Sequence, residues 1–468
     1  MSTPRRPLEP LVAVMGSTGT GKSDLAVDLA LRFNGEIINA DAMQMYRGLP
    51  VITNQISAEE QKGVPHHLLA VVDHYEPTWT VLNFATEAHK VIQGVRSRGR
   101  LPIIVGGTHY YINALLFEDS VLGSQSLSDD NPRIGVEEES SAQFPILNAP
   151  TDVLMNRLRE VDPAMASRWH PSERRKIQRS LEIYLTTGKK ASDIYAEQQR
   201  NRQASRGARG PWEALMFWVY SKPEVLQDRL NRRVDKMVGR ALMAEVKDLH
   251  EQLRRRTDAG ETVDRTKGIW QSIGFKQLEP FLNAEMEERA AEELERLKEA
   301  GLEEMRIATR QYARSQIKWL RGKTVPKLKE HEALDYLYLL DSSNADDFAT
   351  GVLQPAADIC RQFLEGKEMT KPNELSDTAR DVLGALADKG KSSRPALRHR
   401  TCEACHLTVL ESEWEKHVKG RRHRLIMKHK SRTALIPIDG EATADSGSGH
   451  TVVESELKPS SIDLGHFL

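Results

Sequence analysis

Short apolar runs that end in glycine or a small polar residue mark the first part of the chain. The runs "LVAVM" at 11–15, "GEIINAD" at 35–41 and "LPIIVGG" at 101–107 have the length and continuous apolarity of strands buried in a parallel sheet. Between them, segments 22–33 and 83–99 repeat apolar residues with helical spacing. The alternation of strand and helix predicts a doubly wound α/β core.

The pattern changes twice in the middle of the chain. The stretch from Glu118 to Pro150 is rich in Ser, Asp, Glu and Asn, and its lack of periodicity indicates a variable insert with no catalytic part. A helical pattern runs from Thr151 to about Gln203. A further buried strand, "ALMFWVYS" at 214–221, and a long amphipathic helix near 223–256 then follow. The helical block is therefore predicted as an insertion in the α/β core.

The last part of the chain is helical, then polar. Residues 285–323 are helical, Glu-rich first and Arg-rich afterwards, and the tail after Ile436 is rich in Ser, Gly and Glu, which is typical of disorder. The expected organisation is a first core part at 8–150 with the insert at 118–150, a helical insertion domain at 151–210, a second core part at 211–345, a polar linker at 346–397, a small separate module at 398–432, and a disordered tail at 433–468.

Composition excludes several classes of protein. With 468 residues, 39% apolar and 28% charged, the chain can form two or three globular domains. No apolar run approaches the roughly 18 to 20 residues of a membrane span, and the start "MSTPRRPLEP" lacks the apolar middle of a secretory signal. Three cysteines exclude a disulfide framework. We therefore expect an intracellular protein that contacts no membrane. A monomer is expected as well, although the sequence does not determine the oligomeric state.

A glycine-rich segment follows the first predicted strand. "GSTGTGKS" at 16–23 fits G-x-x-x-x-G-K-[ST] and directly precedes a predicted helix, as in phosphate-binding P-loops. Its backbone N–H groups can surround an anion, Lys22 supplies a cation, and Ser23 can bind Mg²⁺. The predicted diphosphate-binding residues are Gly16, Ser17, Thr18, Gly19, Thr20, Gly21, Lys22 and Ser23.

The P-loop by itself favours a nucleotide kinase or NTPase, because most proteins with this loop act on ATP or GTP. Asp41 lies at the carboxyl end of the strand "EIIN", where open α/β sheets bind their ligands. On position alone, this carboxylate could equally bind Mg²⁺ or cap the next helix.

Several segments together point to one family. The segments, in their order along the chain, are "GSTGTGKS", "INADAMQMYRGLPVITN", "GVPHHLL", "VGGTHYYINALL" and "RSLEIYLTTGKKAS". With them, the chain resembles the tRNA dimethylallyltransferase (isopentenyltransferase) family in its eukaryotic form, from about residue 11 to 325 and again at 400–424. The resemblance implies a P-loop NTPase-like core, dimethylallyl diphosphate as the ligand of the loop, and transfer of its prenyl group to N6 of the adenosine at tRNA position 37.

Three residues are expected to be catalytic: Asp41 on chemical grounds, and Arg233 and Thr108 through the resemblance. An adenine amino group is a poor nucleophile, and a base that accepts its proton helps; Asp41 takes this role. Arg233, in "RRVDKM", matches the arginine that stabilises the departing diphosphate, although alone it would be an ordinary surface arginine. Thr108 matches the reaction channel near the adenosine, although alone it would mark a tight strand-to-helix turn.

Two further groups of residues are expected to contact tRNA. The target base must leave its loop and be held in the channel. The resemblance assigns this to Asp41, Ala42, Met43, Gln44, Gln178, Arg179, Ser180, Leu181 and Glu182. Arg306, Arg310, Arg314 and Lys318 recur every four residues, which places them on one side of a helix. The acids lie before this stripe, so we expect its cations to be unpaired and to contact RNA phosphates.

The small module carries a predicted zinc site. Cys402 and Cys405 form C-x-x-C, and His417 and His423 follow at H-x₅-H, a Cys₂His₂ set that suits structural Zn²⁺. His406 and His429 leave some ambiguity in the ligand set. The long histidine spacing resembles matrin-type or U1-like RNA-associated fingers. Residues 394–432 contain eleven Lys or Arg and four Glu, so the finger is expected to hold RNA.

Two other classes of function remain open: a P-loop nucleotide kinase, and a non-catalytic RNA-binding protein with a dead core. A dead core is expected to have lost Asp41, Lys22 or Arg233, and all three are present. The expected partners are dimethylallyl diphosphate and the tRNA anticodon stem-loop, with Mg²⁺ for catalysis and Zn²⁺ in the finger. The expected location is the cytoplasm and mitochondrion, with the nucleus as a further candidate.

Overall fold

The structure is a computed structural model that describes residues 6–76, 78–117, 144–204, 213–388, 399–404, 408–421 and 423–427. Most of the predicted insert at 118–150, the predicted tail at 433–468, and Cys405 with His406 and His429 lie outside these residues. The described residues divide into two compact units. We call them the core unit, with residues up to 117 and from 213 to 388, and the insertion unit, with residues 144–203 and 399–427.

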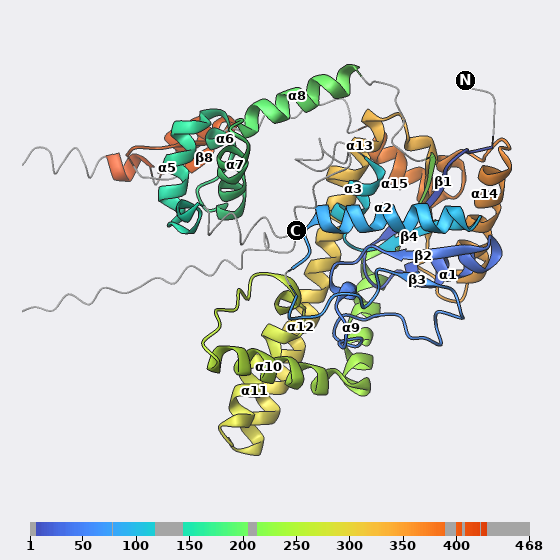
Figure 1. Ribbon diagram of the computed structural model, residues 1–468, viewed down its shortest axis with the longest axis horizontal. Coiled ribbons are helices and arrows are strands. Elements are labelled where there is room, and N and C mark those ends of the chain that lie inside the picture. The colour runs from blue at the N-terminus through green and yellow to red at the C-terminus, as the bar shows by residue number, and fades with distance from the viewer. Residues whose placement is uncertain are drawn as a thin grey trace, which may run out of the picture. The chain divides into compact units, whose positions relative to one another are not determined.

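A parallel six-stranded sheet forms the centre of the core unit (Figure 1). Its strand order is β3-β2-β4-β1-β5-β6. The strands are β1 (Pro10–Gly16), β2 (Gly35–Asn39), β3 (His66–His67), β4 (Leu101–Gly106), β5 (Glu213–Tyr220) and β6 (Leu337–Asp341). The predicted α/β class is confirmed, and the four strands expected from the sequence are present. β3 and β6 were not predicted: the two residues of β3 are too few to show a pattern, whereas the apolar run of β6 is as long as β2 and was overlooked.

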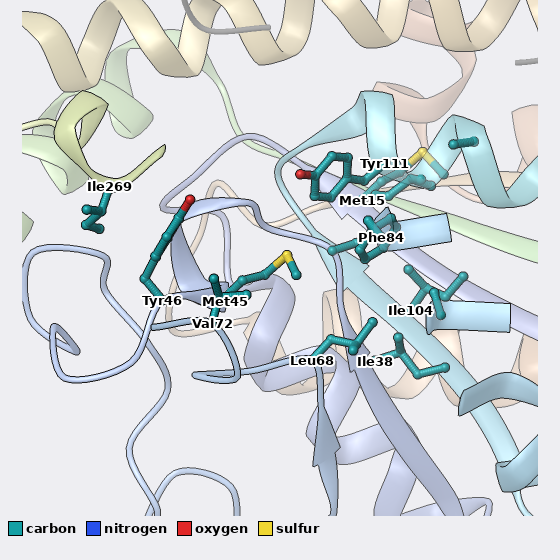
Figure 2. Packing of buried hydrophobic residues seen from close by; sticks show 14 of the residues in the cluster. Met15, Ile38, Met45, Tyr46, Leu68, Val72, Phe84, Ile104, Tyr111 and Ile269 are labelled. Atoms are coloured by element: carbon teal, nitrogen blue, oxygen red, sulfur yellow. The ribbon is translucent and has the colours of Figure 1, made fainter. Parts of the chain in front are cut away.

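Alternating residues of the strands face two separate apolar clusters. In β1, Leu11, Ala13 and Met15 belong to the larger cluster, whereas Val12 and Val14 belong to the other. Helices α2 (Val81–Ser97) and α3 (His109–Leu116) cover the first face, and α1 (Lys22–Arg32) and α14 (Gln354–Glu365) cover the second. Figure 2 shows the first face, where Phe84 and Tyr111 stack with ring centroids 4.2 Å apart.

The segment predicted as a linker, 346–397, is folded over its described part. It forms a π-helix (Ala349–Leu353), α14, a 3₁₀ turn (Pro372–Glu374) and α15 (Asp377–Asp388). Val352, Ala356, Ile359 and Phe363 are buried against the sheet. Their spacing of four, three and four residues makes a helical apolar stripe, which the polar average composition of the segment hides. The prediction of a linker was therefore wrong for residues 346–388.

The predicted long helix near 223–256 is two helices, α9 (Pro223–Arg240) and α10 (Leu242–Asp258). Ala241 separates them with φ −144° and ψ 19°, outside the helical region. No proline marks this break, which is why the pattern read as one helix. α11 (Phe275–Met286) packs on α12 (Ala291–Trp319). A π-helix (Leu320–Thr324) and α13 (Val325–Glu330) follow.

The insertion unit has its own small apolar core. A 3₁₀ turn (Pro145–Asn148), α5 (Thr151–Val161), α6 (Pro163–Arg168), α7 (Arg174–Thr187) and α8 (Ala191–Ala204) form the predicted helical block. The finger segment contributes a hairpin of β7 (His399–Thr401) and β8 (Thr408–Leu410), and helix α16 (Trp414–Val418). None of the described helices is both long and apolar enough to cross a membrane.

The sequence suggested that the finger segment is a separate module. In the structure, the finger segment packs on the helical block instead. Nδ1 of His399 lies 3.0 Å from the carbonyl oxygen of Arg168 at the end of α6. The ring of His399 also meets the ring of His170 edge-on, with centroids 5.6 Å apart. The contact uses a backbone carbonyl and two histidines far apart in sequence, so no sequence pattern announces it.

Candidate active site at the carboxyl ends of three neighbouring strands

The P-loop joins β1 to α1. Gly16, Gly19 and Gly21 have positive φ angles of 149°, 82° and 88°, and a Cβ on Gly16 would lie 2.4 Å from the carbonyl oxygen of Val219. Only glycine fits that approach. Nζ of Lys22 donates to the carbonyl oxygen of Ser17 at 2.6 Å. The ammonium therefore lies against the loop, where a bound diphosphate would meet it.

Asp41 follows β2. In the sheet, β4 lies between β2 and the P-loop strand β1. Its Oδ1 accepts the Met43 N–H at 3.1 Å, and its own N–H donates to Oδ1 of Asn39 at 3.1 Å. These bonds fix the carboxylate in a turn. A Cβ on Gly107 would lie 3.1 Å from Oδ2 of Asp41, so the loop after β4 closely approaches this carboxylate.

Asp41, Lys22 and Arg233 interact electrostatically. Burial raises the pKa of Asp41, against the opposing charges of Lys22 and Arg233. Burial lowers the pKa of Lys22 to about 8, although Asp41 opposes this shift. Burial also lowers the pKa of Arg233 to about 10, and its guanidinium donates to Oγ1 of Thr18 in the P-loop at 2.7 Å. The structure thus brings together a carboxylate and two cations from three distant segments.

Thr108 is the N-cap residue of α3, directly after β4, and lies beside Asp41. Its hydroxyl accepts the Ala42 N–H at 3.0 Å. Tyr312, on α12, hydrogen-bonds both Thr108 and Gln316, and burial raises its pKa. Gln316 accepts the Thr18 N–H at 2.8 Å and donates to the Gly107 carbonyl at 3.0 Å.

Tyr312 and Gln316 were not predicted as site residues; they lie on α12 together with the predicted basic stripe. A signal existed. Thr309 and Gln316 are polar yet buried on the same helix as Met305 and Ala313, at the spacing of an inward-facing stripe. Polar side chains on a buried helix face need hydrogen-bond partners, so such a stripe indicates contacts to another segment.

His109 is a third site residue that the sequence did not indicate. Only 2% of it is exposed, and neither ring nitrogen has a hydrogen-bond partner among the described residues. Burial, with the nearby charge of Lys22, lowers its pKa to about 3, so the imidazole is neutral at physiological pH. A cavity of about 10 Å³ adjoins it and is lined by Gly107, Thr108, His109, Tyr312, Ser315, Gln316 and Trp319.

A larger basic cavity of about 350 Å³ lies along α9. Its lining contains five cations and one carboxylate, which would favour an anionic ligand. The residues are Pro50, Val51, Asn54, Glu60, Arg229, Arg232, Arg233, Lys236, Met237 and Arg240. Since Arg233 also contacts the P-loop, this cavity adjoins the proposed diphosphate site.

The basic stripe on α12 differs from its prediction. Arg306 pairs with Asp235 of α9 at 2.8 Å and with Glu303 at 3.2 Å. Arg310 bonds Asn231 at 2.6 Å and Glu303 at 3.3 Å. These two cations are therefore not unpaired: Asp235 approaches from another helix, and Glu303 lies within reach of the stripe. Arg314 and Lys318 are exposed and make no ion pair in the described part of the chain.

The other predicted RNA contacts fall into two groups. Ala42 lies beside Asp41, Met43 begins a 3₁₀ turn (Met43–Met45), and Nε2 of Gln44 donates to the Asn54 carbonyl at 2.8 Å. Gln178 to Glu182 lie on α7 in the insertion unit. There Leu181 is fully buried in the unit's core, Ser180 accepts from Nε1 of Trp169 at 3.0 Å, and Glu182 pairs with Arg179 at 2.7 Å. Their RNA contact stays a prediction.

Three of the four predicted zinc ligands lie together. Ligand atoms of Cys402, His417 and His423 are all within 4.8 Å of one another, and Sγ of Cys402 is 3.5 Å from Nδ1 of His423. Thiolate and imidazole are the ligands that Zn²⁺ prefers in proteins. The fourth, Cys405, lies outside the described residues. The cluster thus fits the predicted metal.

Comparisons with known proteins agree with this geometry. A model of the family described as IPP transferase matches residues 44–323. The tRNA dimethylallyltransferase of Schizosaccharomyces pombe is 35% identical over 91% of this chain and 97% of its own. That of Saccharomyces cerevisiae is 33% identical over 91% of this chain and 93% of its own. A crystal structure of a eukaryotic dimethylallyltransferase acting on tRNA has 33% identity and a TM-score of 0.73, covering 91% of this chain and 98% of that chain. The chain therefore belongs to the IPP transferase family, whose curated relatives here are tRNA dimethylallyltransferases.

Proposed function

We propose that this tRNA dimethylallyltransferase transfers the dimethylallyl group of dimethylallyl diphosphate to N6 of the adenosine at tRNA position 37. One observation carries the proposal. Asp41, a carboxylate whose pKa is raised, interacts with Lys22 and Arg233, of which Lys22 lies in the P-loop and Arg233 contacts it. A base beside a cationic diphosphate site suits the joining of a nucleophile to a carbon that loses diphosphate.

The leaving-group end is the P-loop. Its backbone N–H groups and the N-terminus of α1 attract the diphosphate, while Lys22 and Arg233 stabilise the negative charge that grows as the C–O bond breaks. Ser23 lies exposed in the first turn of α1, and its hydroxyl makes no hydrogen bond within the described residues, so it fits the predicted Mg²⁺ ligand. When bound, Mg²⁺ would supply further charge neutralisation to the diphosphate.

The acceptor end is the pair of turns after β2 and β4. The N6 nitrogen attacks the allylic carbon, the C–N bond forms as the C–O bond breaks, and Asp41 takes the N6 proton. Burial favours the protonated form of Asp41, which makes its carboxylate a stronger base than one in water. The Thr108 hydroxyl, which accepts the Ala42 N–H, fixes the turn that holds Asp41.

The RNA contacts are proposed to come from both units. Arg314 and Lys318 on α12 and the finger segment supply cations for the backbone of the anticodon stem-loop, and Zn²⁺ at Cys402, His417 and His423 stabilises the finger fold. Because one thiolate and two imidazoles are the ligands typical of structural zinc sites, we assign the metal to structure rather than chemistry. Cytoplasm and mitochondrion, with the nucleus as a third compartment, remain our proposal for location.

Diphosphate release tests the proposal. The full chain is incubated with dimethylallyl diphosphate, with and without tRNA, and in parallel with ATP. We expect stoichiometric diphosphate release only when dimethylallyl diphosphate and tRNA are both present. Transfer of a phosphoryl group from ATP to a small acceptor would instead favour a nucleotide kinase, and tRNA binding without turnover would favour a non-catalytic RNA-binding protein.

A further inference from the structure

The side chain of Gln316 bridges the two ends of the proposed active site. Gln316 lies on α12, and only 3% of it is exposed. Its Oε1 accepts the N–H of Thr18 in the P-loop at 2.8 Å, and its Nε2 donates to the carbonyl oxygen of Gly107 at 3.0 Å. Both ends of one buried amide are thus used, one on the loop after β1 and the other on the loop after β4.

The bridge continues to the proposed base. Tyr312 lies one turn earlier on α12 and hydrogen-bonds both Gln316 and Thr108. Thr108 in turn accepts the N–H of Ala42, the residue next to Asp41. The backbone at Gly107 is packed closely against the amide, because a Cβ there would lie 2.2 Å from Nε2 of Gln316. The amide therefore has little freedom to move.

We propose that Gln316 is a positioning residue that sets the distance and alignment between the diphosphate on the P-loop and the nucleophile beside Asp41. This inference rests on the proposed function. Bond formation requires reacting atoms about 3 to 3.5 Å apart and in line, and a displacement of about 1 Å can cost roughly 10²-fold in rate. No other side chain among the described residues hydrogen-bonds both Thr18 N–H and the Gly107 carbonyl.

Loss of alignment should change the products as well as the rate. If the P-loop shifts relative to the acceptor turns, N6 no longer lies in line with the allylic carbon, and water can attack in its place. The C–O bond then breaks, diphosphate leaves, a C–O bond to water forms, and the water proton passes to solvent. The products are dimethylallyl alcohol and diphosphate, with the tRNA unmodified.

The test uses two variants of the full chain. Gln316→Met keeps the size of the side chain and removes both hydrogen bonds, whereas Gln316→Glu keeps an acceptor for the Thr18 N–H and removes the donor to Gly107. We expect kcat for tRNA prenylation to fall roughly 10 to 100-fold in Gln316→Met and less in Gln316→Glu. We expect the KM for each substrate to change less than about threefold, because neither substrate loses a direct contact.

The distinguishing measurement is the ratio of diphosphate released to tRNA prenylated. It should be one for the unaltered chain and for the control Gln311→Met, a change on the same helix outside the bridge, and above one for Gln316→Met. Wild-type kcat and ratio in both Gln316 variants would overturn the proposal. So would a loss of turnover that follows a lowered unfolding midpoint while the ratio stays at one. Failure of the unaltered chain to prenylate tRNA would instead contradict the proposed function.

Discussion

Asp41 experiences opposing effects at the end of β2. Burial favours its protonated form, while Lys22, the Met43 N–H and Arg233 favour the carboxylate. A general base benefits from the raised pKa, because a higher proton affinity helps its carboxylate to accept the N6 proton. Diphosphate bound at Lys22 and Arg233 would screen these two cations and raise the proton affinity of Asp41 further.

Asp41→Asn should separate catalysis from binding. The amide keeps the size of the side chain and cannot accept a proton as a base. We expect turnover to fall roughly 10² to 10⁴-fold, the range of a positioned general base, with little change in the affinity for inorganic diphosphate. Near-normal turnover at saturating substrates would remove the base role from Asp41.

The two cations at the leaving-group end should behave differently from Asp41. Lys22→Ala and Arg233→Ala remove charge that the transition state needs, so each should lower turnover by roughly 10²-fold and weaken diphosphate binding as well. Steady-state rates at saturating tRNA and direct titration with diphosphate measure the two effects. If neither variant changed the rate, the P-loop would have to bind another ligand.

The lowered pKa of Lys22 predicts how diphosphate affinity depends on pH. Its pKa is lowered to about 8, so its cationic fraction falls as pH rises through 8. Diphosphate affinity without tRNA should therefore weaken above about pH 8 in the unaltered chain. The Lys22→Ala chain, with no such group, should lack that part of the pH dependence. His109, neutral because its pKa is about 3, should contribute no titration between pH 5 and 8. Identical pH dependence in the two chains would exclude titration of Lys22.

At the scale of elements, α12 serves two purposes. Its buried face carries Tyr312 and Gln316 to the active site, while its outer side carries the basic stripe. Within that stripe, Arg306 and Arg310 are 22% and 18% exposed and hold α9 through Asp235 and Asn231. Half of the stripe thus stabilises helix packing, and only Arg314 and Lys318 remain available for phosphate.

Substitutions along the stripe should show this division. Arg314→Ala and Lys318→Ala should each weaken tRNA binding and reduce the slope of log affinity against log salt by about 1. Arg306→Ala should change the slope less and lower the unfolding midpoint, because it breaks contacts to Asp235 and Glu303. If all three variants had the same slope of log affinity against log salt, the stripe would not be divided into packing residues and phosphate-binding residues.

The elements also show what sequence could and could not predict. β1, β4 and β5 contain continuous apolar runs and β2 contains a short one, and the P-loop and Asp41 follow two of these strands; such signals are local. The helix α14 was missed because its apolar stripe lies within a polar segment. Pairing of Arg306 with Asp235 and bridging by Gln316 depend on which helices meet, and this is tertiary information that spacing along one helix does not carry.

At the scale of the whole molecule, the chain divides its tasks between two units. The core unit contains the P-loop, Asp41, Thr108 and Arg233, and the insertion unit contains α7 and the cluster of Cys402, His417 and His423. Contact between His399 and Arg168 joins the finger segment to the insertion helices. Metal binding should therefore stabilise an RNA-binding surface formed by finger and insertion helices together.

Removal of the finger tests this division. Truncation after about residue 390, or Cys402→Ser with Cys405→Ser, should leave turnover at saturating tRNA intact, because no residue of the core unit's site is lost. Affinity for tRNA should fall and its dependence on salt should flatten, since residues 394–432 carry eleven Lys or Arg against four Glu. Collapse of saturated turnover would place the finger in the active site, and unchanged affinity and salt slope would assign it another partner.

Nucleoside analysis of tRNA tests the central claim most directly. Unmodified tRNA with adenosine at position 37, and a matched tRNA with guanosine there, are incubated with dimethylallyl diphosphate and either the unaltered chain or Asp41→Asn. We predict N6-isopentenyladenosine, one per tRNA, only in the adenosine-37 tRNA treated with the unaltered chain, with the Asp41→Asn chain reduced by roughly 10² or more. No modified nucleoside, or equal modification of the guanosine-37 tRNA, would contradict the account.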